Sequence, residues 1–110
     1  MKHDVRVLLV GLAAASTAVV GMAADSRGAA VFEAACKACH EAPPDKQNGA
    51  PQRGDAAEWK ERSSVGRAEQ YKRAIEGYQG YFTMPAKGGN PGLSDEDVKA
   101  AVDYLVGPAP

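Results

Sequence analysis

The sequence predicts an all-α fold of about four helices. Three observations lead to this prediction. Apolar residues recur at helical spacing in several segments, residues that commonly cap helices precede some of these segments, and no segment shows a convincing strand pattern. Stretches rich in proline and glycine separate the segments. A length of 110 residues allows one domain and not two.

The composition is that of an ordinary globular protein, and it excludes several classes. Apolar residues make up 45% of the chain and charged residues 25%, which excludes wholesale disorder. The formal net charge is −1, and no basic patch is interleaved with aromatic residues, so we expect no nucleic-acid binding. Two cysteines are too few for a disulfide scaffold.

Residues 1–23 are predicted to be a secretory signal peptide. Basic residues near the N-terminus precede a run without charge, residues 7–24, that ends in small side chains. We expect cleavage after Ala23, or alternatively after Ala24. The other alternative is an uncleaved membrane anchor, but the run is of marginal length and is diluted by alanine, glycine, serine and threonine. The sequence therefore predicts a periplasmic domain at residues 24–110, with no stable membrane span after cleavage.

The first helix of this domain is expected to begin at Asp25 or Ser26, either of which can cap it, and to run to about His40. The proline pair at 43–44 ends it. From there to Asp55 the chain is rich in proline, glycine, asparagine and glutamine, which predicts a loop.

Three further helices are expected. The second covers residues 55–62 and begins at an aspartate cap, and the third covers residues 67–77. Residues 77–92 hold five glycines and two prolines and predict a loop. The last helix begins after Ser94, carries acidic residues in its first turn and a clear apolar face, and ends at the glycine–proline pair 107–108.

The segment Cys36-Lys37-Ala38-Cys39-His40 has the spacing of a c-type haem attachment site. Residues three apart face the same way on a helical turn, so both thiols can add to the two vinyl groups on one haem edge. His40 follows and can place its imidazole under the iron. Three alternatives are a thioredoxin-like pair, a zinc site and a structural disulfide. The first needs a β-α-β setting, and the second needs a fourth ligand that no other cysteine or histidine of residues 24–110 supplies.

Met84 is predicted to be the second axial ligand of the haem iron. It is the only methionine in residues 24–110, and it lies in a glycine-rich loop, where a core methionine would be oddly placed. Thioether sulfur is a soft ligand that suits haem iron. The alternative is a methionine that fills a packing gap. The sequence thus predicts one haem c, attached through Cys36 and Cys39 and ligated by His40 and Met84.

These features resemble those of class I c-type cytochromes of the short bacterial monohaem kind. The resemblance covers nearly all of residues 24–110, and it includes Gly28-x-x-x-Phe32, Cys36–His40, Gly49-Ala50-Pro51, Gly54-Asp55, Trp59 with Arg62, Met84-Pro85-x-Lys87-Gly88-Gly89, Leu93-Ser94-Asp95-Glu96 and Tyr104-Leu105. It implies a small cytochrome c fold of about four helices wrapped around one covalently attached haem. Two departures are a longer loop after His40 and the lack of an extra cysteine pair that some relatives carry.

The resemblance also implies how the first and last helices meet and how the histidine is held. The two helices are expected to cross near Gly28, where a glycine permits close approach, with Phe32 against Tyr104. The Pro51 carbonyl is expected to accept a hydrogen bond from the outer nitrogen of His40.

Trp59 and Arg62 are further candidates that the resemblance implies, because they can hold a haem propionate. The alternative for Trp59 is plain packing in the core, since a buried indole N–H usually finds some partner. The alternative for Arg62 is a solvated surface charge.

The function that the resemblance implies is one-electron transfer in the periplasm, with the iron cycling between ferric and ferrous, and not enzyme catalysis. The partners would be redox proteins, and Lys37 and Lys87 are hypothesised to steer an acidic one, unless they are ordinary solvated lysines. Two other functions stay open. One is a haem subunit of a larger oxidoreductase, and the other is a haem enzyme or gas sensor in which Met84 dissociates.

Overall fold

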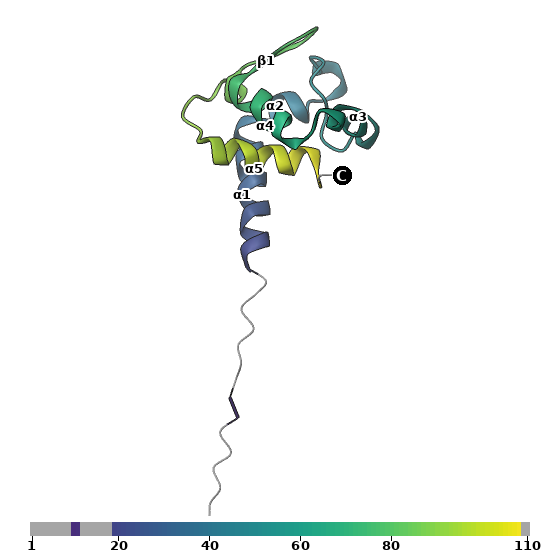
Figure 1. Cartoon of the computed structure of the whole chain (residues 1–110). Helices are drawn as coiled ribbons and strands as arrows, with labels where there is room; N and C mark the ends of the chain where they lie inside the picture. Colours follow the sequence, from purple (N-terminus) through teal and green to yellow (C-terminus); the bar gives the residue numbers. More distant parts are fainter. Residues whose placement is uncertain (1–9, 12–18, 109–110) are drawn as a thin grey trace, which may run out of the picture.

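The structure, a computed structural model, describes residues 10–11 and 19–108, so most of the predicted signal peptide lies outside the described residues. The helices and strands are arranged around α5 (Figure 1). In chain order they are α1 (Val19–Ala35), α2 (Lys37–His40), η1 (Pro44–Lys46), α3 (Ala56–Arg62), η2 (Ser63–Val65), α4 (Arg67–Glu76), β1 (Tyr78–Gln79), β2 (Thr83–Met84), η3 (Ala86–Gly89) and α5 (Asp95–Val106). Within the described residues, no helix is both long and apolar enough to cross a membrane.

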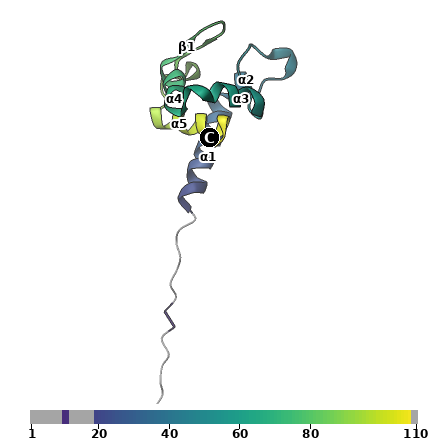
Figure 2. The same ribbon diagram turned by 45° about the vertical axis from the view of Figure 1, so that its right-hand side comes forward.

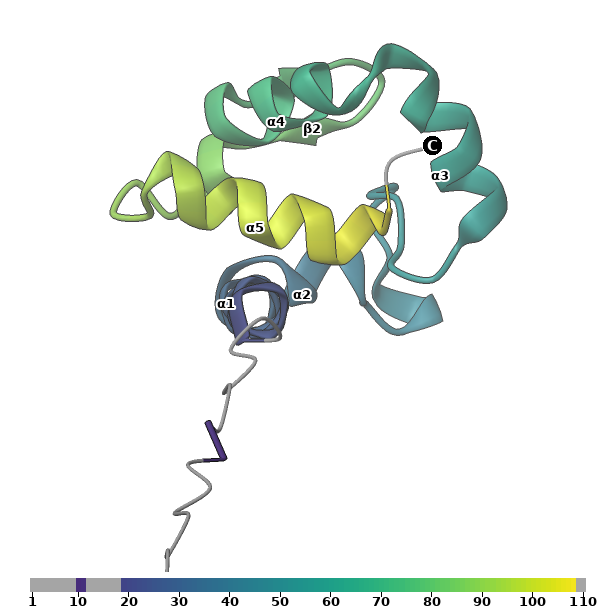
Figure 3. The ribbon, with the colours of Figure 1, turned by 60° about the horizontal axis from the view of Figure 1, so that its bottom comes forward.

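The helix α5 lies between α1 on one side and α4 with the hairpin on the other (Figure 3). With α1 it forms a first buried cluster, which consists of Phe32, Ala101 and Leu105. With α4 it forms a second buried cluster, which consists of Ala74, Val98 and Val102. The described part of the chain is mainly helical, as the sequence predicts.

The expected crossing of α1 and α5 at Gly28 is present. A Cβ atom built on Gly28 would lie 2.4 Å from the carbonyl oxygen of Ala100, so only glycine fits there without displacing backbone. One turn later, the rings of Phe32 and Tyr104 pack with their centroids 5.3 Å apart. The close approach therefore brings the most deeply buried aromatic side chain of the described residues onto α5.

The start of the first helix differs from the prediction. Asp25 and Ser26 do not begin it, because α1 starts at Val19 and passes through both positions. The preceding residues are rich in alanine, which has the highest helix propensity, so a capping residue inside the run does not end it. At the other end the predicted helix is divided, and Cys36 lies between α1 and α2.

The other three predicted helices are confirmed, as are the side-chain caps predicted for α3 and α5. The Asp55 carboxylate accepts a hydrogen bond from the Glu58 N–H at 3.1 Å, at the start of α3. The Ser94 hydroxyl accepts one from the Asp97 N–H at 3.1 Å, at the start of α5. Gly107, with φ of +83°, ends α5.

The prediction that the chain has no strand is wrong, because one short hairpin is present. The strands β1 and β2 form a short antiparallel hairpin in which Tyr78 lies opposite Met84. Each strand has only two residues, which is too short for a period-two pattern to register in the sequence. The hairpin and the loop after α2 both rise on the side of the body away from the start of α1 (Figure 2).

Candidate haem site

The two thiols and the imidazole predicted from the sequence lie in and next to the single turn of α2. The His40 N–H donates to the Cys36 carbonyl at 3.0 Å and the Cys39 N–H donates to the same oxygen at 3.2 Å, which fixes the turn. Both cysteines are free, so the structure has no disulfide between them. Cys36 is half-buried and packs against the first cluster, whereas Cys39 is exposed. Burial, and next the neighbouring Cys39, raise the pKa of the Cys36 thiol.

His40 is the one buried ionisable side chain of the described residues, with 7% of its surface exposed. Its Nδ1 lies 2.8 Å from the carbonyl oxygen of Pro51, and the hydrogen bond that the resemblance implies is therefore present. A carbonyl oxygen can only accept, so Nδ1 carries the proton and the Nε2 lone pair of the neutral ring is left for a metal.

The environment of His40 favours its neutral form. Burial is the largest influence and lowers the pKa of the imidazole, the hydrogen bond to Pro51 opposes this, and the positive charge of Arg62 lowers the pKa further. Metals bind the neutral ring, so the site presents histidine in its ligand form near neutral pH.

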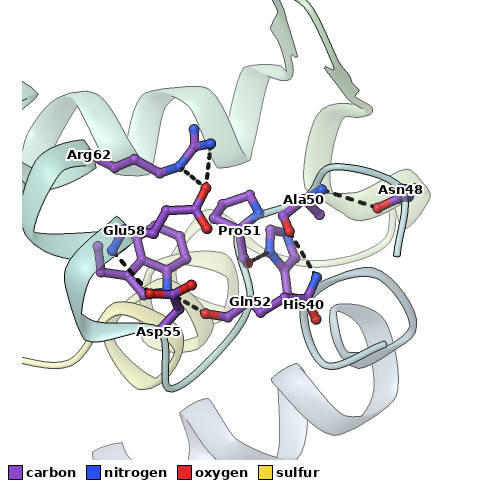
Figure 4. A network of polar contacts seen from close by, with 9 residues as sticks. His40, Asn48, Ala50, Pro51, Gln52, Asp55, Glu58 and Arg62 are labelled. Carbon is purple, nitrogen blue, oxygen red and sulfur yellow. Dashed lines mark hydrogen bonds and ion pairs between the residues drawn. The ribbon is translucent and has the colours of Figure 1, made fainter. Parts of the chain in front are cut away.

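Trp59 and Arg62 both have partners within the protein. The Trp59 indole N–H donates to the carbonyl of Gln52 at 2.8 Å, and its ring packs against the first cluster. The Arg62 guanidinium binds one carboxylate oxygen of Glu58 through two nitrogens, at 2.9 and 2.7 Å. Figure 4 shows this ion pair near Pro51 and His40. A propionate role for Trp59 and Arg62 stays a prediction.

Met84 lies in β2, is half-buried, and packs against the second cluster. Two contacts tie its segment to the segment of His40. A Cβ atom built on Gly49 would fall 2.5 Å from ring carbons of Phe82, so this ring rests on the loop that leads to Pro51. A Cβ atom on Gly88 would fall 3.0 Å from the carbonyl oxygen of Ala35, so the chain after Met84 rests on the end of α1.

The two lysines considered for partner steering are both ion-paired. The Lys37 ammonium, at the start of α2, lies 2.6 Å from the carboxylate of Glu33 near the end of α1. The Lys87 ammonium lies 3.0 Å from the Asp95 carboxylate and donates to the Leu93 carbonyl at 2.7 Å. Lys87 therefore holds the loop after Met84 to the start of α5 and is not a free surface charge.

The residues present fit a haem with two thioether links and two protein ligands. The groups available to bind a haem are two free thiols, an imidazole nitrogen with a free lone pair and a thioether. Large apolar side chains of the hairpin are also exposed. Phe82 and Tyr78 in the hairpin are 51% and 41% exposed, although each is a large apolar side chain. In the part of the chain that the structure describes, no three histidine, cysteine or acidic side chains converge on a point where they could hold a metal ion by themselves. A flat apolar group that carries its own metal ion would fit between the turn of α2 and the hairpin, where it would cover Phe82 and Tyr78.

Sequence reasoning missed one residue of this site. The Gln52 side chain makes hydrogen bonds to the backbone of Cys39, Ala42 and Ala50, and its own carbonyl accepts one from the Trp59 indole. Figure 4 shows the bond to Ala50. A lone glutamine in a polar loop carries no pattern in the sequence, because its partners are backbone groups brought together only by the fold.

Comparison with known proteins agrees with this site. The family model described as "Cytochrome C oxidase, cbb3-type, subunit III" matches residues 23–105. The chain is 40% identical over 86 residues to cytochrome c-555 of Prosthecochloris aestuarii, which covers 74% of this chain and 84% of that protein. It is 42% identical over 81 residues to cytochrome c-555 of Chlorobaculum thiosulfatiphilum, covering 73% and 91%. The cytochrome c-555 of Chlorobaculum tepidum is 42% identical over 81 residues, covering 73% and 72%. The chain therefore belongs to the small class I c-type cytochromes, which are haem-binding electron carriers and not enzymes.

Proposed function

We propose that this cytochrome is a periplasmic one-electron carrier. It carries one haem c, linked through Cys36 and Cys39, with His40 and Met84 as axial ligands. The observation that carries the proposal is the His40–Pro51 hydrogen bond of 2.8 Å. This bond leaves the lone pair of Nε2 free to bind a metal, next to two free thiols. When bound, the haem supplies an iron that cycles between ferric and ferrous states.

The protein's own residues have three tasks in this function. His40 donates through Nε2, and its hydrogen bond to Pro51 fixes the ring orientation and increases its basicity. The hairpin would supply the Met84 thioether as the second ligand, and its aromatic side chains would pack against the bound haem. With both axial positions filled, no coordination site stays open for a substrate.

The periplasmic location and the domain boundary rest on the sequence. A basic start, an uncharged run and small residues before Ala24 support export and cleavage after Ala23, with residues 24–110 as the mature domain.

The test of the axial ligand is the variant Met84→Ala. It should abolish the weak red absorption band of the oxidised protein, because that band arises from charge transfer between thioether sulfur and ferric iron. The control is Thr83→Ala, which changes the exposed neighbour in β2 and should keep the band. An unchanged spectrum of Met84→Ala would disprove methionine ligation.

A second candidate function is a haem subunit that stays bound to a larger oxidoreductase, which the description of the matching family model favours. Size-exclusion chromatography of a native periplasmic extract separates the two functions. A free carrier should elute at the size of a monomer of the mature domain, whereas a subunit should elute with a larger complex.

A haem enzyme or gas sensor would need Met84 to leave the iron. Mixing the reduced protein with carbon monoxide tests this, because the gas binds only where an axial position is open. We expect slow and incomplete binding. Rapid binding by the unmodified protein would favour the sensor or enzyme.

A further inference from the structure

The side chain of Gln52 makes hydrogen bonds on both sides of the histidine. Its Oε1 accepts from the backbone N–H of Ala42 at 2.9 Å, and its Nε2 donates to the backbone carbonyl of Cys39 at 2.8 Å. These two residues flank His40 in the chain, so one amide group holds the turn that carries the imidazole.

The same amide also holds the segment that carries Pro51. Its Nε2 donates a second hydrogen bond, to the Ala50 carbonyl at 2.8 Å, so both hydrogens of this nitrogen are used. The backbone carbonyl of Gln52 accepts from the Trp59 indole at 2.8 Å, which connects the segment to α3. Gln52 therefore joins the turn of His40, the segment of Pro51 and α3.

Such a connection matters because the loop between the two partners is long. Ten residues, 41–50, separate His40 from Pro51, and only a short 3-10 turn is regular within them. Closing such a loop costs conformational entropy, so the contact between its ends depends on further bonds at those ends. The segment after Pro51 also contacts His40 directly, because the Arg53 N–H donates to the His40 carbonyl at 2.7 Å.

We propose that Gln52 is a positioning residue that fixes the Pro51 carbonyl against Nδ1 of His40 and thereby tunes the iron. The inference rests on the proposed ligation by His40. A firm hydrogen bond from Nδ1 makes the imidazole a better donor, which stabilises ferric iron. Loosening that bond should therefore raise the reduction potential of the haem.

The experiment compares two equivalent substitutions in the holoprotein, Gln52→Met and Gln47→Met. Both replace glutamine by an apolar side chain of similar length in the same loop. Gln47 makes one hydrogen bond there, to the Ala42 carbonyl at 3.3 Å, and none to the segment of Pro51. The readouts are the reduction potential by spectroelectrochemistry, and the rates of hydrogen exchange at the His40 Nδ1–H and the Ala42 amide by NMR.

We expect Gln52→Met to have a higher reduction potential than the parent protein. Exchange at the Nδ1–H and at the Ala42 amide should be roughly tenfold faster, which is the scale of losing one hydrogen bond. Gln47→Met should keep the parent's potential and Nδ1–H exchange. An unchanged potential and Nδ1–H exchange in Gln52→Met, or an equal change in both variants, would overturn the inference.

A second variant covers the case in which Gln52→Met does not fold. Gln52→Glu keeps the length and the oxygen that faces Ala42 but, when ionised, loses both N–H donors. The added negative charge itself stabilises ferric iron, so Nδ1–H exchange is the readout for this variant. That exchange should again become faster, and an unchanged rate would again overturn the inference. The parent protein separates this inference from the proposed function. A parent without bound haem, or with His40 not on the iron, contradicts the proposed function. If the parent protein binds haem through His40 but the Gln52 variants keep the parent's readouts, only this inference is contradicted.

Discussion

Glycine at position 28 sets how closely α1 and α5 approach each other. The atoms that a Cβ would meet are the Ala100 carbonyl oxygen and carbon, at 2.4 and 3.0 Å, and the Tyr104 Cβ, at 3.2 Å. Two of these are backbone atoms and cannot move by a change of rotamer. The contact of Phe32 with Tyr104 and the half-buried position of Cys36 follow from this approach.

Gly28→Ala should therefore lower the free energy of unfolding, although alanine has the higher helix propensity. Overpacking at such a contact costs about 1–3 kcal/mol. Urea denaturation of the holoprotein measures the change. Gly92→Ala is the control, because a Cβ built on Gly92 has no neighbour within 4 Å, and its effect should be within about 0.5 kcal/mol. Equal stability of Gly28→Ala and the parent would contradict the close crossing.

At the residue scale, the sequence predicts those site residues whose spacing carries chemistry. Cys36, Cys39 and His40 follow from a local pattern, and the structure places them together in one turn. Gln52 could not be predicted, since its partners lie up to thirteen residues away and are backbone atoms. The hydrogen-bond partner of Pro51 came from the family resemblance and not from spacing.

At the scale of helices and strands, an ion pair joins the middle of α1 to the first turn of α5. The Arg27 Nε lies 2.6 Å from the Asp97 carboxylate. This guanidinium, and next the Ser94 side chain, hold the pKa of the Asp97 carboxyl below its ordinary value of 3.8. A group with a lowered pKa in the folded state stabilises the fold above its unfolded pKa, and this contribution is lost as the pH falls through the folded value.

Asp97→Asn should therefore be less stable than the parent at pH 7, and the difference should shrink as the pH falls below 3.8. Urea unfolding at a series of pH values gives the two curves. Glu96→Gln removes one charge from the same turn and is the control. Glu96 pairs only with Lys99 of its own helix, so this variant should lower the free energy of unfolding by less. A constant difference between Asp97→Asn and the parent across this range would show that the pair with Arg27 does not stabilise the fold.

Periodicity and caps predict three of the four helices well, because their stop signals are local. Ser94 and Gly107 bound α5 as expected. The first helix was predicted to start too late, since an alanine-rich run continues through a residue that could cap it. The hairpin was missed because strands of two residues carry no period, and tertiary contacts such as Phe82 on Gly49 help to hold it.

At the scale of the whole molecule, the described residues form two small buried clusters and not one large core. Each cluster has three buried side chains, one between α1 and α5 and one between α4 and α5. Cys36 packs against the first and Met84 against the second. A haem held by both residues would therefore join the two clusters and supply apolar bulk that a small domain lacks.

A chain that cannot attach haem should lose its fixed tertiary structure. The double variant Cys36→Ala, Cys39→Ala, exported and purified, should show poorly dispersed amide resonances and a weak near-ultraviolet circular dichroism signal, while part of the helical signal persists. A well-dispersed spectrum from this variant would mean that the protein core is sufficient without haem. Lys37→Ala is a suitable control, because it alters the motif but keeps both thiols.

The intact mass of the exported protein tests the central claim most directly, because it reports signal cleavage and haem attachment together. We expect the mass of residues 24–110, or 25–110 for cleavage after Ala24, plus one haem that stays bound under denaturing conditions. A denatured mass equal to the polypeptide alone would contradict covalent attachment through Cys36 and Cys39.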